Sequence, residues 1–507
     1  MGFILKYLFV CVLLLLVVAS LGLRLSFPGA QSDRPVIYWV TDRNPARELQ
    51  VATFHEWLAE NGHVDERGEP IVELRLDVAN RDTTKQTIQS VSGVGGDLMD
   101  MPGQVMWLFR AMGVIEDITD DARAMGFGPE QTYEAIQPEI TVEGRQYRYP
   151  ANVTVPMLWV NPDTFRRYGL EPPPPRWTWD EFEALGIAFK EAANPPGTPA
   201  SDRRFILSAV DSSLTQMYRS TGLSILNETL TASDLDDPRY VETLTRLHHW
   251  IYGLNILPTP DDVQAFDAAQ GYGGVSLQLF NRGQYAMVSG GRWLLIQLRR
   301  FEGLGELSVV ELPHRDFPNS LIATRAVALY KGSKHPELAK LFLAYLASDA
   351  YNELIVADAD ALPPNPKLTA TDAFLRPADY PSEWGVHEAF VDAAQTIAIG
   401  RTYSPYILPT VMERIRKDYA DQYNNNMIGA EAAARRTAEV TDRRIADNIR
   451  RKPELRDAYA ADVALQKKID ELKEKGEPIP EAWVKNPFYR EYYRQTGKLI
   501  SEESTHG

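Results

Sequence analysis

A turn near the middle of the chain combines residues that could hold a polar ligand. Ser289-Gly290-Gly291 ends an apolar stretch typical of a strand, and Arg292 and Trp293 then open a predicted helix. Backbone amides at a helix start bounded by glycine can donate to a ligand oxygen, and the adjacent indole offers a flat apolar face. An indole packed in the core fits the pattern equally well. The turn is therefore a candidate binding site whose aromatic residue has two interpretations.

Neighbouring carboxylates could indicate acid–base catalysis, but the clearest pair has a structural explanation. Thr178-Trp179-Asp180-Glu181 matches a capping box, in which Thr178 accepts from the amide three residues on and Glu181 reaches back to the cap. Because the helix dipole favours acidic side chains in the first turn, we expect Asp180 and Glu181 to start a helix rather than to catalyse a reaction.

Motifs of several other chemistries are missing from the sequence. The eight histidines are scattered without the HExxH spacing of a zinc site, and the single cysteine, Cys11, excludes an intramolecular disulfide and a CxxC cluster. Gly93, Gly95 and Gly96 are not followed by the Gly-Lys-Ser/Thr of a phosphate-binding loop, and no GxSxG elbow occurs. We therefore expect no metal and no cofactor.

Strands and helices alternate along much of the chain. Residues 36–40 and 72–78 have strand patterns, and residues 46–60 and 83–91 have helical spacing. Further strands are predicted at 153–160, 307–312 and 326–329, and further helices at 106–112, 238–253 and 336–346. This alternation predicts an α/β architecture with a largely parallel sheet.

Size and charge restrict the class of protein. A chain of 507 residues exceeds what one hydrophobic core usually supports, so two or more lobes are expected. The net charge of −16 argues against general affinity for nucleic acid or anionic lipid. A small-molecule partner fits this composition better.

The two ends of the chain differ from its body. An unbroken apolar run from residue 7 to 19 follows Lys6 and has the pattern of an export signal, either cleaved or retained as a membrane anchor. The body is therefore expected in the periplasm or outside the cell. Near the other end, residues 455–475 predict a charged helix with a thin apolar stripe, and residues 483–493 are rich in aromatic side chains. We expect this end to be strapped across the main body.

Several motifs follow one another in a characteristic order. They are Gly96-Asp97-Leu98, Tyr149-Pro150 with Leu158-Trp159-Val160-Asn161-Pro162-Asp163, Thr178-Trp179-Asp180-Glu181-Phe182, and the stretches 280–287, 291–293 and 332–339. Together, over roughly residues 36–448, they resemble the extracellular solute-binding proteins of bacterial ABC importers, in the branch that includes maltodextrin, glycerol-phosphate and other sugar binders.

The resemblance implies a two-lobed periplasmic-binding-protein fold of type II, in which crossing segments form a hinge. Lobe 1 would comprise residues 33–152 and 310–350, and lobe 2 residues 153–309 and 351–448. The crossings would fall near 152–154, 307–313 and 346–363. A leader at 1–30 and a helical C-terminal extension at 449–507 would complete the chain.

The resemblance also implies a set of ligand-binding residues. By position in the motifs these are Asp42, Arg43, Asp100, Met101, Gln104, Asn152, Thr154, Gly291, Arg292, Trp293, Tyr403 and Tyr406. Such residue types suit a sugar, because an aromatic ring can cover the apolar face of a pyranose while charged and amide groups bond its hydroxyls. Arg43 and Arg292 leave phosphate or carboxylate ligands possible.

The implied function is a receptor without catalytic activity that delivers a carbohydrate or polyol to an ABC permease. Two alternatives remain open. One is a secreted carbohydrate-active enzyme that uses paired carboxylates such as Asp42 and Asp100. The other is a sensor or scaffold whose aromatic C-terminal end contacts a partner. The solute, the permease and the oligomeric state do not follow from the sequence.

Overall fold

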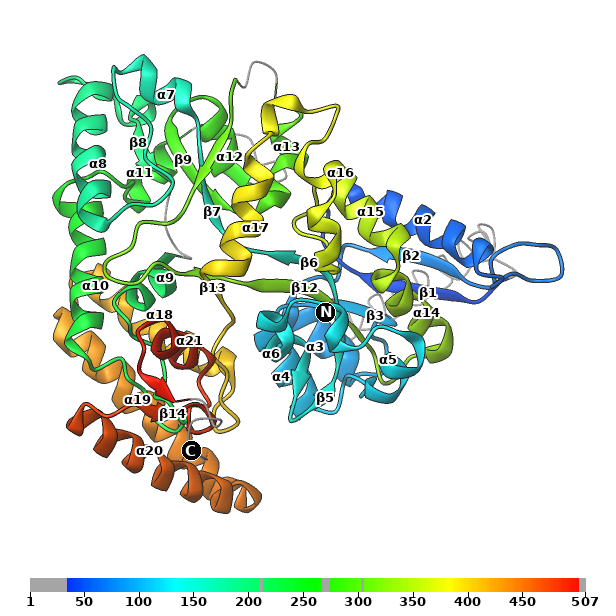
Figure 1. Cartoon of the computed structure of the whole chain (residues 1–507). Helices are drawn as coiled ribbons and strands as arrows, with labels where there is room; N and C mark the ends of the chain where they lie inside the picture. Colours follow the sequence, from blue (N-terminus) through cyan, green and yellow to red (C-terminus); the bar gives the residue numbers. More distant parts are fainter. Residues whose placement is uncertain (1–33, 209–212, 267–273, 302–304, 501–507) are drawn as a thin grey trace, which may run out of the picture.

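Two β-sheets form the centres of two lobes in this computed structural model, which describes residues 34–208, 213–266, 274–301 and 305–500 (Figure 1). Lobe 1 is built on a five-stranded sheet of order β2-β1-β3-β12-β6, and lobe 2 on a four-stranded sheet of order β10-β7-β9-β8. The strands of lobe 1 are β1 Val36–Val40, β2 Glu73–Asp77, β3 Leu98–Met101, β6 Arg148–Thr154 and β12 Ala323–Leu329. Those of lobe 2 are β7 Met157–Val160, β8 Phe205–Leu207, β9 Tyr285–Gly290 and β10 Ser308–Val310.

The sheets are mixed, so the prediction of a largely parallel sheet is wrong. Strand β1 runs parallel to β2 and β3, but β12 is antiparallel to both β3 and β6. In lobe 2, β7 is antiparallel to β9 and β10, and only β8 pairs with β9 in parallel. In lobe 1 the reversed strand is β12, which joins the sheet only after the chain has returned from lobe 2.

Alternation along β1 explains how helices cover both faces of the lobe 1 sheet. Ile37 and Trp39 point into a core with Phe54 and Phe342, which lie on helices α2 (Ala46–Glu60) and α14 (Pro336–Ala347). Val40 points the other way, toward α4 (Gly103–Ala111). Helices α3 (Thr83–Val91), α5 (Thr119–Met125) and α15 (Asp349–Asp358) complete the layer structure. The predicted bounds of β1, α2 and α3 are confirmed to the residue.

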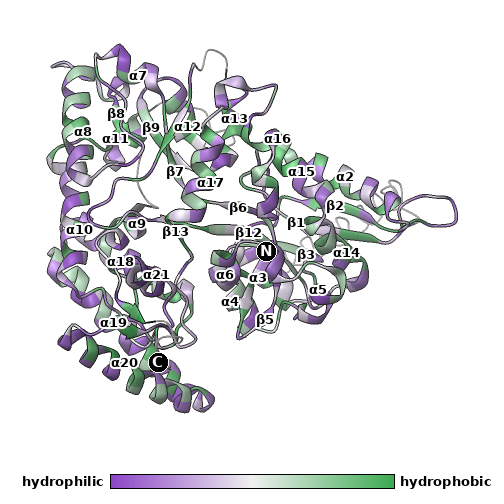
Figure 2. Ribbon diagram, in the orientation of Figure 1, coloured by the Kyte–Doolittle hydropathy of each residue, from purple (hydrophilic) through white to green (hydrophobic). Residues whose placement is uncertain are grey.

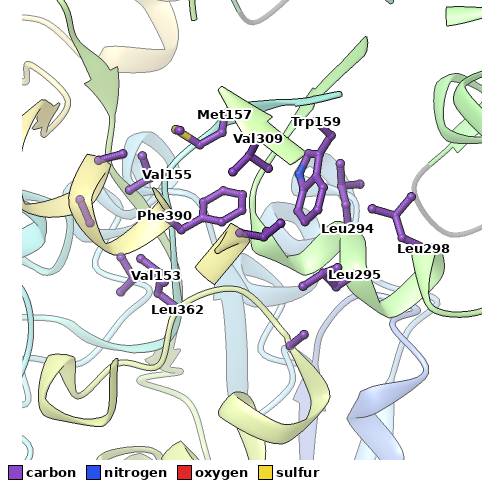
Figure 3. Packing of buried hydrophobic residues seen from close by; sticks show 14 of the residues in the cluster. Val153, Val155, Met157, Trp159, Leu294, Leu295, Leu298, Val309, Leu362 and Phe390 are labelled. Atoms are coloured by element: carbon purple, nitrogen blue, oxygen red, sulfur yellow. The ribbon is translucent and has the colours of Figure 1, made fainter. Parts of the chain in front are cut away.

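The lobe 2 sheet is also covered on both faces. Leu158 and Val160 face a core with Phe182 on α8 (Trp179–Ala193), and the capping box predicted at Thr178 and Glu181 is present in both directions. Met157 and Trp159 face the opposite core, shown in Figure 3, where Phe390 of α17 (Val386–Thr396) lies 5.5 Å from the Trp159 ring centroid.

A group of helices extends lobe 2 below its sheet in the view of Figure 1. It contains α9 Ser213–Ser220, α10 Pro238–His248, α18 Pro409–Asn424, α19 Ala430–Arg451, α20 Arg456–Lys475 and α21 Pro487–Gln495. Hydrophobic and hydrophilic residues alternate along these helices (Figure 2). Their buried apolar side chains pack in two clusters. The charged helix predicted at 455–475 corresponds to α20.

Shorter elements connect these parts. They are α6 Gln137–Ile140, α7 Pro162–Arg167, α11 Pro260–Ala265, α12 Gly274–Asn281, α13 Leu295–Leu298, α16 Asp372–Leu375, β4 Thr141–Val142, β5 Arg145–Gln146, β11 Ser320–Leu321, β13 Ala398–Ile399, β14 Ile479–Pro480 and β15 Leu499–Ile500.

Three segments cross between the lobes, and they correct the sequence-based boundaries. The strand predicted at 153–160 is two strands in two sheets. Pro156 between them has no backbone N–H to donate to a neighbouring strand, and its carbonyl accepts from the hydroxyl of Ser320. The second crossing follows β10, and the chain rejoins the lobe 1 sheet only at Ala323 instead of near residue 310. The third crossing follows α15, which packs on α2 of lobe 1, and its Leu362 bridges to Val153.

The predicted leader, residues 1–30, lies outside the described residues. Within the described ranges, no helix combines the length and the apolar character needed to cross a membrane.

We predict that the core in Figure 3 is a major source of stability for lobe 2. Phe390→Ala removes a fully buried ring and should lower the free energy of unfolding by about 3–5 kcal/mol in urea denaturation followed by circular dichroism. Ile88→Ala, at a side chain that is 61% exposed, is the control and should change it by less than about 0.5 kcal/mol. Equal effects of the two changes would contradict this assignment of the core.

Candidate functional site

A buried cluster of charges lies where the crossings meet lobe 1. The carboxylate of Asp360, on the third crossing, accepts from Arg47 at 2.5 Å and from Arg325 at 3.5 Å. Its other oxygen accepts from Asn44 at 3.2 Å and from Asn152, on the first crossing, at 3.1 Å. Burial alone would raise the pKa of Asp360, but the two guanidinium groups outweigh it and lower that pKa. The cluster therefore holds a charged carboxylate at the hinge.

Asp42 and Asp100 belong to the same cluster. Asp42 accepts from Arg47 Nε at 2.8 Å, and although burial opposes ionisation, Arg47 and Arg325 lower the pKa of Asp42 to about 2. Asp100 is buried and accepts from Trp39 Nε1 at 2.6 Å and from Arg325 at 2.6 Å, as well as from a threonine hydroxyl. Both carboxylates are thus engaged inside the protein.

Three residues expected at the ligand are part of the frame instead. Asp100 and Asn152 are buried, and the donors of the cluster take their polar atoms. Met101 is 3% exposed and packs in the core between α4 and the lobe 1 sheet. The lobe 1 core and the hinge use their side chains in this structure, and contact of these residues with a ligand stays a prediction.

Arg292, another residue expected at the ligand, is also buried inside the protein. It is 1% exposed and donates to the carbonyls of Ile355, Val356 and Ala361 at 3.0–3.4 Å and to His387 Nδ1 at 3.0 Å. Burial, with the nearby Arg299, lowers the pKa of Arg292 to about 9. Arg292 therefore ties lobe 2 to the third crossing, and its contact with a ligand stays a prediction.

The structure does bring Thr154, Gly291 and Trp293 together. A side chain at Gly291 would collide with Thr154 Oγ1 and would lie 2.8 Å from Trp293 Cδ1. Thr154 Oγ1 is buried and makes no hydrogen bond within the described part of the chain, whereas the Trp293 ring is half-buried against the lobe 2 core. The predicted turn thus places an indole and a hydroxyl beside the first crossing.

A second group of predicted residues lines a cavity of about 100 Å³ between the lobes. Gln104 on α4 contributes from lobe 1, and Tyr403 contributes from lobe 2. The remaining lining residues come from lobe 2 and are Thr215, Tyr218, Arg219, Ile225, Leu321, Arg401, Thr402, Pro409, Met412 and Glu413. Gln104 Oε1 is buried and has no hydrogen-bond partner among the residues described.

The lobes touch beside this cavity through Glu139. Its carboxylate, which is 1% exposed, accepts from Tyr403 Oη at 2.7 Å and lies 3.5 Å from Arg401 Nε. On its own lobe it pairs with the fully buried Arg148. Burial, reinforced by the charge of Glu139, raises the pKa of Tyr403 well above its usual value. Since the ring of Trp107 also lies 5.8 Å from Tyr403, a large guest requires these contacts to open.

The two remaining predicted residues lie apart from the cavity lining. Tyr406 is 2% exposed and donates to Asp462 of the C-terminal extension at 2.7 Å, and its expected ligand role stays a prediction. Arg43 is exposed on the loop after β1. A separate hollow of about 470 Å³ next to Arg204 and Arg282 has lobe 2 residues only and no aromatic ring, so it is a weaker candidate.

The sequence patterns missed Glu139, Arg401, Tyr218 and Arg219. A lone glutamate gives no signal, because its importance depends on the folded contacts with Arg148 and with Tyr403, which is 264 residues away in sequence. Tyr218 and Arg219 lie on α9, and sequence spacing does not show what such a helix faces. The signal that was available was Tyr403, whose neighbours Arg401 and Thr402 line the same wall.

We predict that the charge of Asp42 stabilises the fold in a pH-dependent way. Its pKa near 2 lies below the value of about 4 in an unfolded chain, so the stabilisation is present above about pH 4 and is lost as the pH falls toward 2. Asp42→Asn should therefore lower the free energy of unfolding by about 1–2 kcal/mol at pH 6, and the deficit should shrink by pH 3. Asp180→Asn, at an 85% exposed side chain, is the control. A deficit as large at pH 3 as at pH 6 would contradict the prediction.

Comparison with solved structures identifies the fold. The chain is similar to an ABC substrate-binding protein from Listeria monocytogenes in complex with cycloalternan, at 19% identity and a TM-score of 0.68, with 82% of this chain and 100% of that chain covered. It is also similar to the GacH receptor of Streptomyces glaucescens, at 15% identity, a TM-score of 0.65 and the same coverage of both chains. These likenesses confirm the predicted two-lobed periplasmic-binding-protein fold.

A third similar structure is the maltose/maltodextrin-binding domain MalE from Bdellovibrio bacteriovorus bound to maltotriose, at 16% identity, a TM-score of 0.60 and coverage of 82% of this chain and 100% of that chain. No curated protein matches the sequence significantly. The family model described as "bacterial extracellular solute-binding protein" matches residues 51–353, which is more than half of the chain. The protein therefore belongs to the bacterial extracellular solute-binding protein family.

Proposed function

We propose that this protein is the solute receptor of an ABC importer, which captures a carbohydrate between its lobes and delivers it unchanged to a membrane permease. The observation that carries the proposal is the composition of the cleft. Gln104 Oε1, on the cavity wall that also carries Tyr403, is a buried polar atom without a partner in the described structure, and so is Thr154 Oγ1, which lies with the half-buried ring of Trp293 around Gly291 at the first crossing. Aromatic faces and neutral hydrogen-bonding groups are what a sugar needs.

The related structures support the same ligand class. The Listeria protein was solved in complex with cycloalternan, the GacH receptor with acarbose and the Bdellovibrio domain with maltotriose. The cavity of about 100 Å³ is too small for a trisaccharide, so we propose that the lobes separate at Glu139 and Tyr403 to admit the ligand. The family's extracellular location and the apolar leader support a place outside the cytoplasm.

Catalysis by the pair Asp42 and Asp100 is the weaker alternative. A glycosidase needs one carboxyl group that keeps its proton near neutral pH, whereas the pKa of Asp42 is about 2. Asp100 is buried behind Trp39 and Arg325, which occupy its oxygens. Neither group is arranged to protonate a glycosidic oxygen.

The proposal is tested with maltotriose, acarbose, a monosaccharide panel and sugar phosphates, each added to the full chain in a thermal-shift and calorimetric titration. We expect saturable binding of at least one oligosaccharide, a raised Tm and unchanged sugar by chromatography. Release of a shorter sugar would support the enzyme alternative and contradict the receptor. Failure of every sugar to bind would contradict the ligand class.

We predict that Trp293 supplies a stacking face for the sugar. Trp293→Ala should weaken binding of the best oligosaccharide by about 5- to 150-fold, which corresponds to about 1–3 kcal/mol. Trp384→Ala is the matched control, since that indole is 51% exposed on the outer surface of lobe 2, and it should leave the Kd within twofold. Unchanged affinity in Trp293→Ala would show that this indole only packs against the core.

A further inference from the structure

The C-terminal strap, defined as residues 456–500, packs beneath the wall of the cleft. The wall segment is residues 397–403, which includes β13 and carries Arg401 and Tyr403 into the interlobe cavity. Helix α21 of the strap contacts β13 directly, and its Phe488 lies against Arg219 of α9. The strap is therefore in position to determine where the wall stands.

Asn486 makes the most direct connection. Its side chain is completely buried, and its Oδ1 accepts from the hydroxyl of Thr402 at 3.2 Å. Its Nδ2 donates to Ser224 Oγ at 3.0 Å and to the carbonyl of Leu226 at 2.7 Å. One amide thus joins the strap, the wall and the loop after α9. Leaving any of these buried polar groups unpaired would be costly.

A second contact runs through Arg219. This buried guanidinium donates to the carbonyl of Gly400 at 3.0 Å and to Thr402 Oγ1 at 3.3 Å, and its Cζ lies 5.2 Å from the ring centroid of Phe488 on the strap. Phe488 also packs edge-on against Phe317 of the second crossing. The wall is therefore held from below by an aromatic ring and an amide of the strap.

The strap is anchored away from the wall by a buried carboxylate. Glu228 accepts from Lys473 at 2.8 Å, from Gln466 at 2.7 Å and from the hydroxyl of Tyr493. Burial opposes its ionisation, but Lys473 and these hydrogen bonds lower the pKa of Glu228. Because Phe488, Tyr489 and Tyr493 are all buried, the aromatic residues that the sequence offered as a partner surface are used within the chain.

We infer that Asn486 is a positioning residue of the cleft, acting through Thr402 on the flanking Arg401 and Tyr403, and that the C-terminal strap is a working part of the binding site. The effect on ligand affinity rests on the proposed carbohydrate-binding function. The effect of Asn486 on the position of the wall does not rest on that function.

The test compares Asn486→Ala, Thr402→Val and the double variant in the full chain. Both single changes remove the same hydrogen bond, from opposite sides, and Thr402→Val keeps the shape of its side chain. We expect each to raise amide hydrogen exchange in peptides covering 397–403 at least threefold without ligand. Each should also weaken maltotriose binding at least fivefold, and the double variant should be no weaker than the worse single variant.

The control is Tyr493→Phe, which loosens the strap at Glu228 without touching the wall. It should leave exchange at 397–403 and the maltotriose Kd within twofold of the parent protein. Unchanged exchange in both single variants, or raised exchange with unchanged affinity, would overturn the inference. If the parent protein binds no maltotriose while the exchange rises as expected, the positioning of the wall is supported and the proposed ligand class fails instead.

Discussion

A buried carboxylate at the hinge determines the geometry of the rest of the molecule. Asp360 is 1% exposed, so its charge persists only because Arg47 and Arg325 lie against it and two amides complete its hydrogen bonds. Buried ion pairs add little net stability on balance, because desolvation offsets their attraction. What such ion pairs do is fix the positions of the segments that they join. This one joins the third crossing to the loop after β1, and Asn152 brings in the first crossing, so both crossings leave lobe 1 from one fixed point.

That constraint separates the residues that build the frame from those that can meet a guest. Three polar side chains have their hydrogen-bond partners inside the protein. Asp100 accepts from Arg325, Asn152 donates to Asp360, and Arg292 donates to backbone carbonyls of the third crossing. The interlobe cavity is lined mostly by neutral or aromatic residues, among them Gln104 and Tyr403, together with the charged Arg219, Arg401 and Glu413. Such a surface suits hydroxyl groups better than a strongly charged ligand, and the C-terminal strap stiffens the wall on one side.

Local patterns predicted local structure well, and long-range contacts account for what they missed. The bounds of α2 and the capping box at Thr178 follow from spacing within a few residues, so they were predictable. Arg292 has the right type and a promising position, but its donors are taken by carbonyls of residues 355–361, about sixty residues later in the chain. Glu139 matters only because folding brings Arg148 and Tyr403 to it. Of the predicted residues, Gln104 and Tyr403 line the interlobe cavity, because the order of the motifs pointed to the family and its two-lobed fold.

We expect the two lobes to close on a small ligand about this hinge. This closure is tested most directly by double electron–electron resonance between spin labels at Val91→Cys on lobe 1 and Met427→Cys on lobe 2, both exposed positions, in a Cys11→Ser background. Closure of the lobes predicts that the distance distribution shifts and narrows when saturating maltotriose, or whichever sugar of the panel binds, is added. An identical distribution with and without a sugar that demonstrably binds would contradict it.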